Sequence, residues 1–138
     1  MAYRAQVMDH LVRPRNVGEI PTPSGTGESG DAACGDIARF TVDIEENRVE
    51  KVRYQVYGCA ACIAAGSALT ELVDGAHLLS AAKVSRMDLQ GALGGALPEG
   101  KDHALTLVVD ALHKAFEDHW NREADVLLAG YGNEVHDG

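Results

Sequence analysis

The sequence lacks three features that would each point to a particular class of protein. No stretch of the 138 residues is long and apolar enough to span a membrane. Residues 1–18 show no charged region followed by an apolar core, so we expect no signal peptide and a cytoplasmic location. The net charge is −9, and nucleic acids and membrane surfaces are bound by clustered basic side chains. We therefore expect neither as a partner; the acidic charge suits a basic partner protein or simply keeps the chain soluble.

Cysteine is also scarce, with three residues in the whole chain. An odd number of cysteines without a secretory signal argues against a disulfide framework and favours metal or thiol chemistry in a reducing compartment. The spacings of Cys34, Cys59 and Cys62 do not match those of a zinc finger or zinc ribbon. Any metal site would therefore be assembled by the fold from distant parts of the chain.

The hydrophobic pattern predicts helices and two strands. Residues 37–45 and 49–57 alternate between apolar and polar side chains, which predicts an antiparallel hairpin. Residues 19–35 are rich in glycine, proline and small polar residues, which is typical of a loop. Helical patterns cover residues 1–12, 59–74, 76–93 and 102 to about 120. In the first long helical pattern, Cys62, Leu69, Leu72 and Val73 share one side.

This order of elements predicts an α+β fold, a small antiparallel sheet with helices packed on one face. We assign residues 1–120 to one domain and residues 121–138 to a C-terminal extension or tail, because the hydrophobic periodicity weakens after Trp120. Within this tail, Val126-Leu127-Leu128 either extend the helix or dock onto the body. In an antiparallel pair, the start of one strand lies beside the end of the other. Cys34 and Cys59 flank the hairpin at those two ends, so we expect them to converge.

Thiols, a carboxylate and an imidazole are the candidate metal ligands. Cys59 stands where the strand pattern changes to a helix pattern, and Cys62 follows one turn later. A helix N-terminus lowers the pKa of a thiol and favours the thiolate, which is a metal ligand and a nucleophile. Cys34-Gly35-Asp36 adds a thiol and a carboxylate, and His103 begins the last helix. Such side chains can hold zinc tetrahedrally or an iron-sulfur cluster with mixed ligands.

Most of these residues also have a purely structural explanation. Cys62 could fill space on the inner side of an alanine-rich helix, because free cysteine is among the most buried residue types. Asp36 could accept hydrogen bonds from its loop, and His103 could be an ordinary helix-start residue. Cys34 lies in a polar, glycine-rich loop that offers no core to fill. Cys59 and Cys62 also have the spacing of a redox-active dithiol, although a hairpin is not the βαβ unit that usually carries one.

Several motifs together resemble one family, the U-type scaffolds of iron-sulfur cluster assembly, which comprise IscU and the N-terminal domain of NifU. The motifs follow in the expected order over roughly residues 1–120: Asp9-His10, Pro14-Arg15-Asn16-Val17-Gly18, Ala33-Cys34-Gly35-Asp36, Tyr57-Gly58-Cys59 and Ser67-Ala68-Leu69-Thr70-Glu71. The resemblance implies a compact α+β sandwich of the SufE/NifU type. It also implies a scaffold without turnover of its own, which receives sulfur from a cysteine desulfurase. The family assembles a [2Fe-2S] cluster, passes it to acceptor apoproteins, and often binds zinc instead.

Carried over residue by residue, the resemblance makes Cys34 and Cys59 cluster cysteines and Asp36 the aspartate that assists cluster release. The family's third cysteine follows a histidine at the start of the long helix, where this chain has His103-Ala104. Cys62 stands where the family usually has a small residue without a thiol, and it is the thiol available to replace the missing one. We predict a metal site formed by Cys34, Cys59, His103 and either Cys62 or Asp36.

Three interpretations of this pattern remain open. The first is a scaffold or carrier for an iron-sulfur cluster or iron, and the second is a zinc-binding or regulatory relative that cannot assemble clusters. The third is a thiol-disulfide protein that uses Cys59 and Cys62. Residues Leu97-Pro98-Glu99-Gly100-Lys101 keep the outline of the chaperone-recognition segment of bacterial members but replace its central Pro-Val. Handling by an Hsp70-type chaperone is therefore not implied. As a separate expectation, the protein is a monomer or a weak homo-oligomer.

Overall fold

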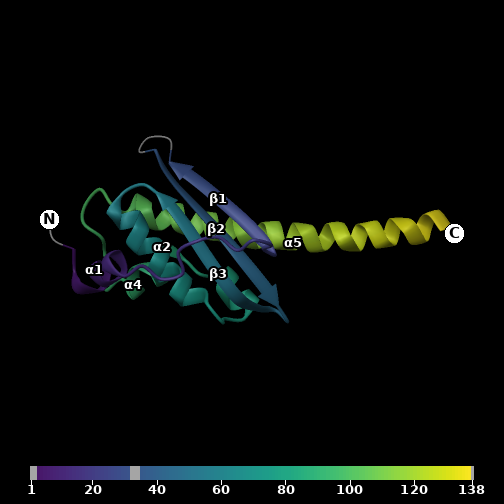
Figure 1. Ribbon diagram of the computed structural model, residues 1–138, viewed down its shortest axis with the longest axis horizontal. Coiled ribbons are helices and arrows are strands. Elements are labelled where there is room, and N and C mark those ends of the chain that lie inside the picture. Colours follow the sequence, from purple (N-terminus) through teal and green to yellow (C-terminus); the bar gives the residue numbers. More distant parts are fainter. Residues whose placement is uncertain (1–2, 32–34, 138) are drawn as a thin grey trace.

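The computed structural model describes residues 3–31 and 35–137, and it places one small sheet against a layer of helices (Figure 1). The elements in chain order are α1 (Ala5–Val12), β1 (Gly25–Asp31), β2 (Asp36–Glu45), β3 (Arg48–Tyr57), α2 (Ala60–Val73), α3 (Leu78–Ala82), α4 (Arg86–Ala92) and α5 (His103–Asp137). The three strands form an antiparallel sheet in the order β1-β2-β3. Helices α2 and α5 pack on one face of it, which confirms the predicted α+β fold.

The predicted hairpin is present as β2 and β3. Phe40 on β2 pairs with Tyr54 on β3, and both side chains are buried under the helices, with their rings stacked at a centroid distance of 5.9 Å. Glu46 and Asn47 form the connection with positive φ angles of 50° and 62°, as a two-residue turn between twisted strands requires. The period-two alternation therefore identified both strands because each buries one face.

The prediction of a loop over residues 19–35 was wrong for Gly25–Asp31, which form β1 and extend the sheet to three strands. Gly25 and Gly27 have no side chains, so the strand shows no apolar alternation. The glycines are needed because a Cβ atom on Gly27 would overlap the backbone of α5. The backbone N–H of Thr26 donates to Asp118 Oδ2 on α5 at 2.8 Å. Helix α5 thus lies directly against the backbone of β1.

Helix α2 is buried on almost every side between the sheet and the other helices (Figure 1). Its small residues allow this close packing: a Cβ atom on Gly66 would lie 2.5 Å from the ring of Tyr54. Cys62 and Leu69 are buried as predicted, whereas Leu72, placed on the same inner side by the sequence, is 39% exposed. The inner side of α2 was misjudged at Leu72 because an alanine-rich helix has little hydrophobic asymmetry.

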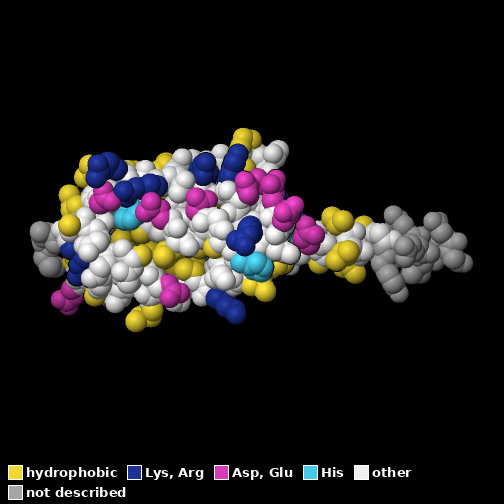
Figure 2. Space-filling view, turned by 90° about the horizontal axis from the view of Figure 1, so that it is seen from below, with side chains coloured by type: hydrophobic (Ala, Val, Ile, Leu, Met, Phe, Trp, Pro, Cys, Tyr) yellow, Lys and Arg dark blue, Asp and Glu magenta, His cyan; other side chains and the backbone are white. Residues whose placement is uncertain are grey.

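Helix α5 passes the predicted end near Trp120 and continues to Asp137, so residues 126–128 extend the helix. Beyond Trp120 it projects from the body of the protein (Figure 1), and the hydrophobic side chains on this part of it stand exposed (Figure 2). Leu127 is 72% exposed, which shows that this turn has no partner within the described residues. A helical segment that packs against no other element needs no apolar face. The hydrophobic pattern could therefore not show how far α5 continues. No helix in the described part of the chain is long and apolar enough to cross a membrane.

Candidate metal centre

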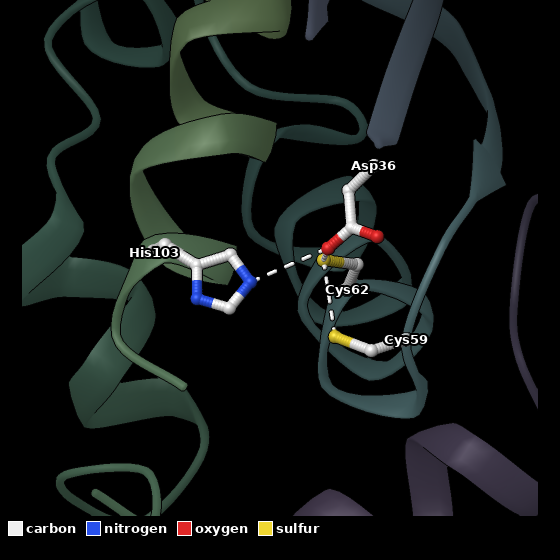
Figure 3. Close-up of side chains that lie close together, drawn as sticks. All are labelled: Asp36, Cys59, Cys62 and His103. Atoms are coloured by element: carbon white, nitrogen blue, oxygen red, sulfur yellow. Dashed lines mark hydrogen bonds and ion pairs between the residues drawn. The ribbon is translucent and has the colours of Figure 1, made fainter. Parts of the chain in front are cut away.

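Four of the predicted site residues meet where three elements begin. Asp36 opens β2, Cys59 and Cys62 lie at the start of α2, and His103 is the first residue of α5 (Figure 3). Each residue offers one ligand atom, and these atoms all lie within 4.8 Å of one another. The register explains the convergence: Ile37 pairs with Tyr57, so the residue before β2 and the residues after β3 lie at the same end of the sheet.

Cys34, the remaining predicted ligand, lies outside the described residues, so its place in the site stays a prediction. Ala104 follows His103 and is fully buried. Its methyl group offers no ligand atom at the position where the resembling family carries a thiol.

Short contacts connect the four side chains. Cys62 Sγ donates to Asp36 Oδ2 at 3.4 Å and lies 3.5 Å from Cys59 Sγ. His103 Nε2 lies 3.3 Å from the same oxygen, Asp36 Oδ2 (Figure 3). Two sulfurs, one carboxylate oxygen and one imidazole nitrogen therefore surround a common point. This is a donor set that zinc accepts and that iron accepts in mixed-ligand clusters.

The tautomer of His103 supports a cation at this point. Its Nδ1 lies 3.1 Å from the carbonyl oxygen of Gly100. A carbonyl oxygen can only accept, so in the neutral ring Nδ1 carries the proton and Nε2 presents its lone pair to Asp36. Two acceptors then face each other, an arrangement that a metal ion or a proton between them would satisfy. Donation of the other ring N–H to a carbonyl is also the usual way in which a metal-binding histidine is oriented.

Gly58 is a residue whose role in the site the sequence interpretation missed. A Cβ atom on Gly58 would lie 2.5 Å from Asp36 Oδ1, inside the van der Waals contact distance. The absence of a side chain at this position therefore leaves space for the Asp36 carboxylate. The Tyr57-Gly58-Cys59 motif contained the signal, but only the strand register shows which side chain occupies the space.

The structural explanation of Cys62 is confirmed, because its side chain is completely buried, and the same side chain also contacts Asp36. Burial, followed by the neighbouring Cys59 and Asp36, raises the pKa of the Cys62 thiol above its usual value. Burial at Cys62 thus opposes the thiolate stabilisation that a helix N-terminus provides. A metal ion that binds Cys62 would displace the proton of the thiol.

A second polar cluster lies away from the site, between α1 and α2. His10 Nδ1 is 2.7 Å from Ser67 Oγ and 3.1 Å from Arg15 Nη1, and His10 Nε2 is 3.4 Å from Glu71 Oε1. Arginine can only donate, so Nδ1 accepts and Nε2 carries the ring proton. His10 is 8% exposed and joins α1 to α2, so its contacts serve the packing of the two helices.

Comparison with known proteins supports the resemblance seen in the motifs. A family model described as the NifU-like N-terminal domain matches residues 2–126. The chain is 58% identical over 131 residues to the bifunctional protein NifU/MnmA of Rubrobacter xylanophilus, covering 94% of this chain and 27% of that protein. The chain thus spans about a quarter of the length of this relative.

A shorter relative aligns over most of its own length. The iron-sulfur cluster assembly scaffold protein IscU 1 of Archaeoglobus fulgidus is 38% identical over 124 residues, covering 90% of this chain and 80% of that protein. Among solved structures, the N-terminal NifU-like protein of Brucella abortus superimposes with a TM-score of 0.67. It is 17% identical and covers 86% of this chain and 94% of its own, so it supports the fold alone.

Proposed function

Because the chain belongs to the NifU-like N-terminal domain family, we propose that it is a scaffold on which an iron-sulfur cluster is assembled for transfer to acceptor proteins. Relatives aligned over most of their length bear the name of iron-sulfur cluster assembly scaffold proteins. The observation that carries the proposal is the group of Asp36, Cys59, Cys62 and His103 with all ligand atoms within 4.8 Å. The cluster, or the iron that precedes it, is cargo for this site.

We assign the cargo to these four side chains together with Cys34. Thiolates suit iron and sulfur chemistry because they are soft, charged ligands. Cys62 takes the place of the thiol that is missing at Ala104, supported by its contacts with Cys59 and Asp36. His103, oriented by Gly100, completes the donor set.

The scaffold works with other proteins and has no turnover of its own in this proposal. Sulfur would come from a cysteine desulfurase, and the loaded cluster would pass to acceptor apoproteins. The thiols of Cys34, Cys59 and Cys62 must all be reduced to bind the cargo, so the proposal places the protein in a reducing compartment such as the cytoplasm.

We further propose that residues 1–120 form the scaffold domain and that residues 121–138 are an extension of it. Phe116 is fully buried, whereas every residue from Asn121 to Gly130 is exposed. Arg122 still touches the body, because its Nη1 donates to the carbonyl oxygen of Pro23 at 2.9 Å.

Zinc is the second candidate cargo, because four ligand atoms of sulfur, nitrogen and oxygen within 4.8 Å also suit a tetrahedral zinc ion. A chain that holds zinc and cannot form a cluster would be a regulatory relative rather than a scaffold.

Anaerobic reconstitution distinguishes these functions. The reduced protein is incubated with ferrous iron and sulfide, and bound iron, acid-labile sulfide and visible absorption are measured. A scaffold binds iron and sulfide in equal amounts, becomes coloured, and then loses the colour to an apo-ferredoxin. Retention of zinc without colour supports the zinc-binding relative, and a protein that binds neither metal contradicts both proposals.

A further inference from the structure

Cys59 and Cys62 differ in their access to solvent although their sulfur atoms are neighbours. Cys59 is the N-cap residue of α2 and is partly exposed, whereas Cys62 is completely buried. Their sulfur atoms lie 3.5 Å apart. The Cys59 thiol is thus open to a reagent from solvent. The buried Cys62 thiol can react with that reagent only after it has become attached to Cys59. This is the order of attacking and resolving thiols in a dithiol exchange reaction.

The inference rests on the proposed function and concerns the sulfur of the cargo. Clusters contain sulfur as sulfide, whereas persulfide donors carry it as sulfane sulfur, which needs two electrons to become sulfide. Two thiols that join in a disulfide release two electrons. We propose that Cys59 accepts a sulfane sulfur from a persulfide and that Cys62 then expels it as sulfide, leaving a Cys59–Cys62 disulfide.

The reaction has two balanced steps. In the first step, the Cys59 thiolate attacks the outer sulfur of a persulfide R–S–SH, which forms Cys59–S–SH and releases R–S⁻. In the second step, Cys62 Sγ attacks Cys59 Sγ, the bond from Cys59 to the outer sulfur breaks, and HS⁻ leaves. The overall change converts two thiols and one persulfide into one disulfide, one thiol R–SH and hydrogen sulfide.

The structure supplies the groups that the second step needs. The sulfur atoms must approach by about 1.5 Å to reach the disulfide bond length. The backbone N–H of Cys62 donates to the carbonyl oxygen of Cys59 at 3.0 Å, which keeps the two residues within one turn. The Cys62 thiol already donates to Asp36 Oδ2, so its proton passes to that oxygen as Cys62 attacks. Sulfide is then released beside Asp36 and His103, where the proposal places iron.

The reaction is stoichiometric, because the disulfide removes two of the proposed ligands. An external dithiol reductant must restore Cys59 and Cys62 before they can bind cargo. Cys59 and Cys62 therefore release sulfide and bind cargo in turn, and they cannot do both at once.

A reaction without iron tests the inference. The reduced protein, freed of reductant, is mixed with glutathione persulfide; released sulfide is measured against a protein-free control, and protein masses and disulfides are mapped. The wild-type protein should release sulfide in the same amount as it forms the Cys59–Cys62 disulfide. In Cys62→Ser, we expect sulfide release to fall about tenfold or more and one additional sulfur to remain on Cys59. In Cys59→Ser, neither product should form.

Three results would overturn the inference: wild-type sulfide release from Cys62→Ser, a wild-type disulfide that maps to Cys34, or sulfane sulfur first captured on Cys62. The last is measured in the wild-type protein by alkylation at early times, so it needs no variant that must fold. Cys62→Ala provides a second, smaller replacement in the buried position. Because iron is absent, a protein that reduces persulfide but forms no cluster contradicts only the proposed function. Assembly from iron and sulfide without persulfide reduction contradicts only this inference.

Discussion

Gly58 and Asp36 lie so close that a Cβ atom on Gly58 would be 2.5 Å from Asp36 Oδ1 and 2.6 Å from its Cγ. Asp36 is almost fully buried at the end of the sheet, with Cys62 and His103 both contacting its Oδ2. The missing side chain at position 58 therefore determines where the carboxylate can stand. This contact links a strand-end glycine to the geometry of the candidate metal centre.

Replacement of Gly58 tests that link. In Gly58→Ala, the new methyl group displaces the Asp36 carboxylate, and we expect the affinity for zinc to fall about tenfold, as for loss of an orienting group. Gly91→Ala is the matched control, because a Cβ atom on Gly91 would meet no atom within 4 Å in the described structure. Competition with a chromophoric chelator measures both affinities. Equal affinities in the two variants would contradict the role of Gly58.

The His10 cluster predicts a loss of stability in mild acid. Burial, followed by the charge of Arg15, lowers the pKa of His10 below its usual value of 6.5. Below about pH 6.5 the unfolded chain binds a proton that the folded chain excludes, so stability is full above this pH and falls as the pH decreases towards the folded-state pKa. One proton contributes at most about 1.4 kcal/mol per pH unit.

Urea unfolding between about pH 7.5 and about pH 5.5 measures this dependence. The free energy of unfolding of the wild-type protein should decrease more steeply than that of His10→Gln, which has no imidazole to protonate. The difference between the two slopes isolates His10 from the other histidines. Parallel curves would show that His10 is protonated equally in the folded and unfolded chains.

Two glycines of β1 should differ sharply in their tolerance of a methyl group. Gly27 faces the backbone of α5, whereas a Cβ atom on Gly30 would be 3.8 Å from its nearest neighbour. We expect Gly27→Ala to lower the free energy of unfolding by about 2 kcal/mol or more, because backbone atoms cannot move aside easily. Gly30→Ala should change it by no more than about 0.5 kcal/mol. Denaturant titration provides the measurement, and similar values for both variants would contradict the packing of α5 against β1.

The exposed end of α5 should be dispensable for the scaffold domain. A chain that ends at Arg122 keeps the contact of Arg122 with Pro23 and loses turns that are exposed at every residue from Glu123 to Gly130. We expect its free energy of unfolding to change by less than about 0.5 kcal/mol and its zinc affinity to be unchanged. Thermal and chelator titrations test this boundary. A large loss of stability would place residues after Arg122 inside the domain.

The contrast between β1 and the hairpin shows what the sequence could predict about the fold. Phe40 and Tyr54 alternate with polar residues because their strands each bury one face, so the pattern revealed both strands. Gly27 carries no side chain, and its backbone packs directly against the backbone of α5, which is distant in the sequence. Periodicity detects side-chain burial, and it therefore misses a strand whose contacts are made by its backbone.

The same distinction holds at the candidate site. The approach of Asp36 to Cys59 follows from strand pairing, which the alternating pattern implies. The sequence left Cys62 as either a core residue or a ligand, although a helix start at the edge of the core allows it to be both. The approach of His103 to Asp36 joins residues that are 67 positions apart in the sequence, so no local pattern could predict it.

Cobalt(II) titration of the anaerobic protein is the most direct test that Asp36, Cys59, Cys62 and His103 act as one metal centre. Cobalt reports its coordination by absorption, with intense bands for tetrahedral geometry and charge-transfer bands whose strength follows the number of thiolates. We predict a tetrahedral spectrum with thiolate charge transfer that weakens in both Cys59→Ser and Cys62→Ser. A weak octahedral spectrum without charge transfer, or wild-type intensity in both variants, would contradict the proposed centre.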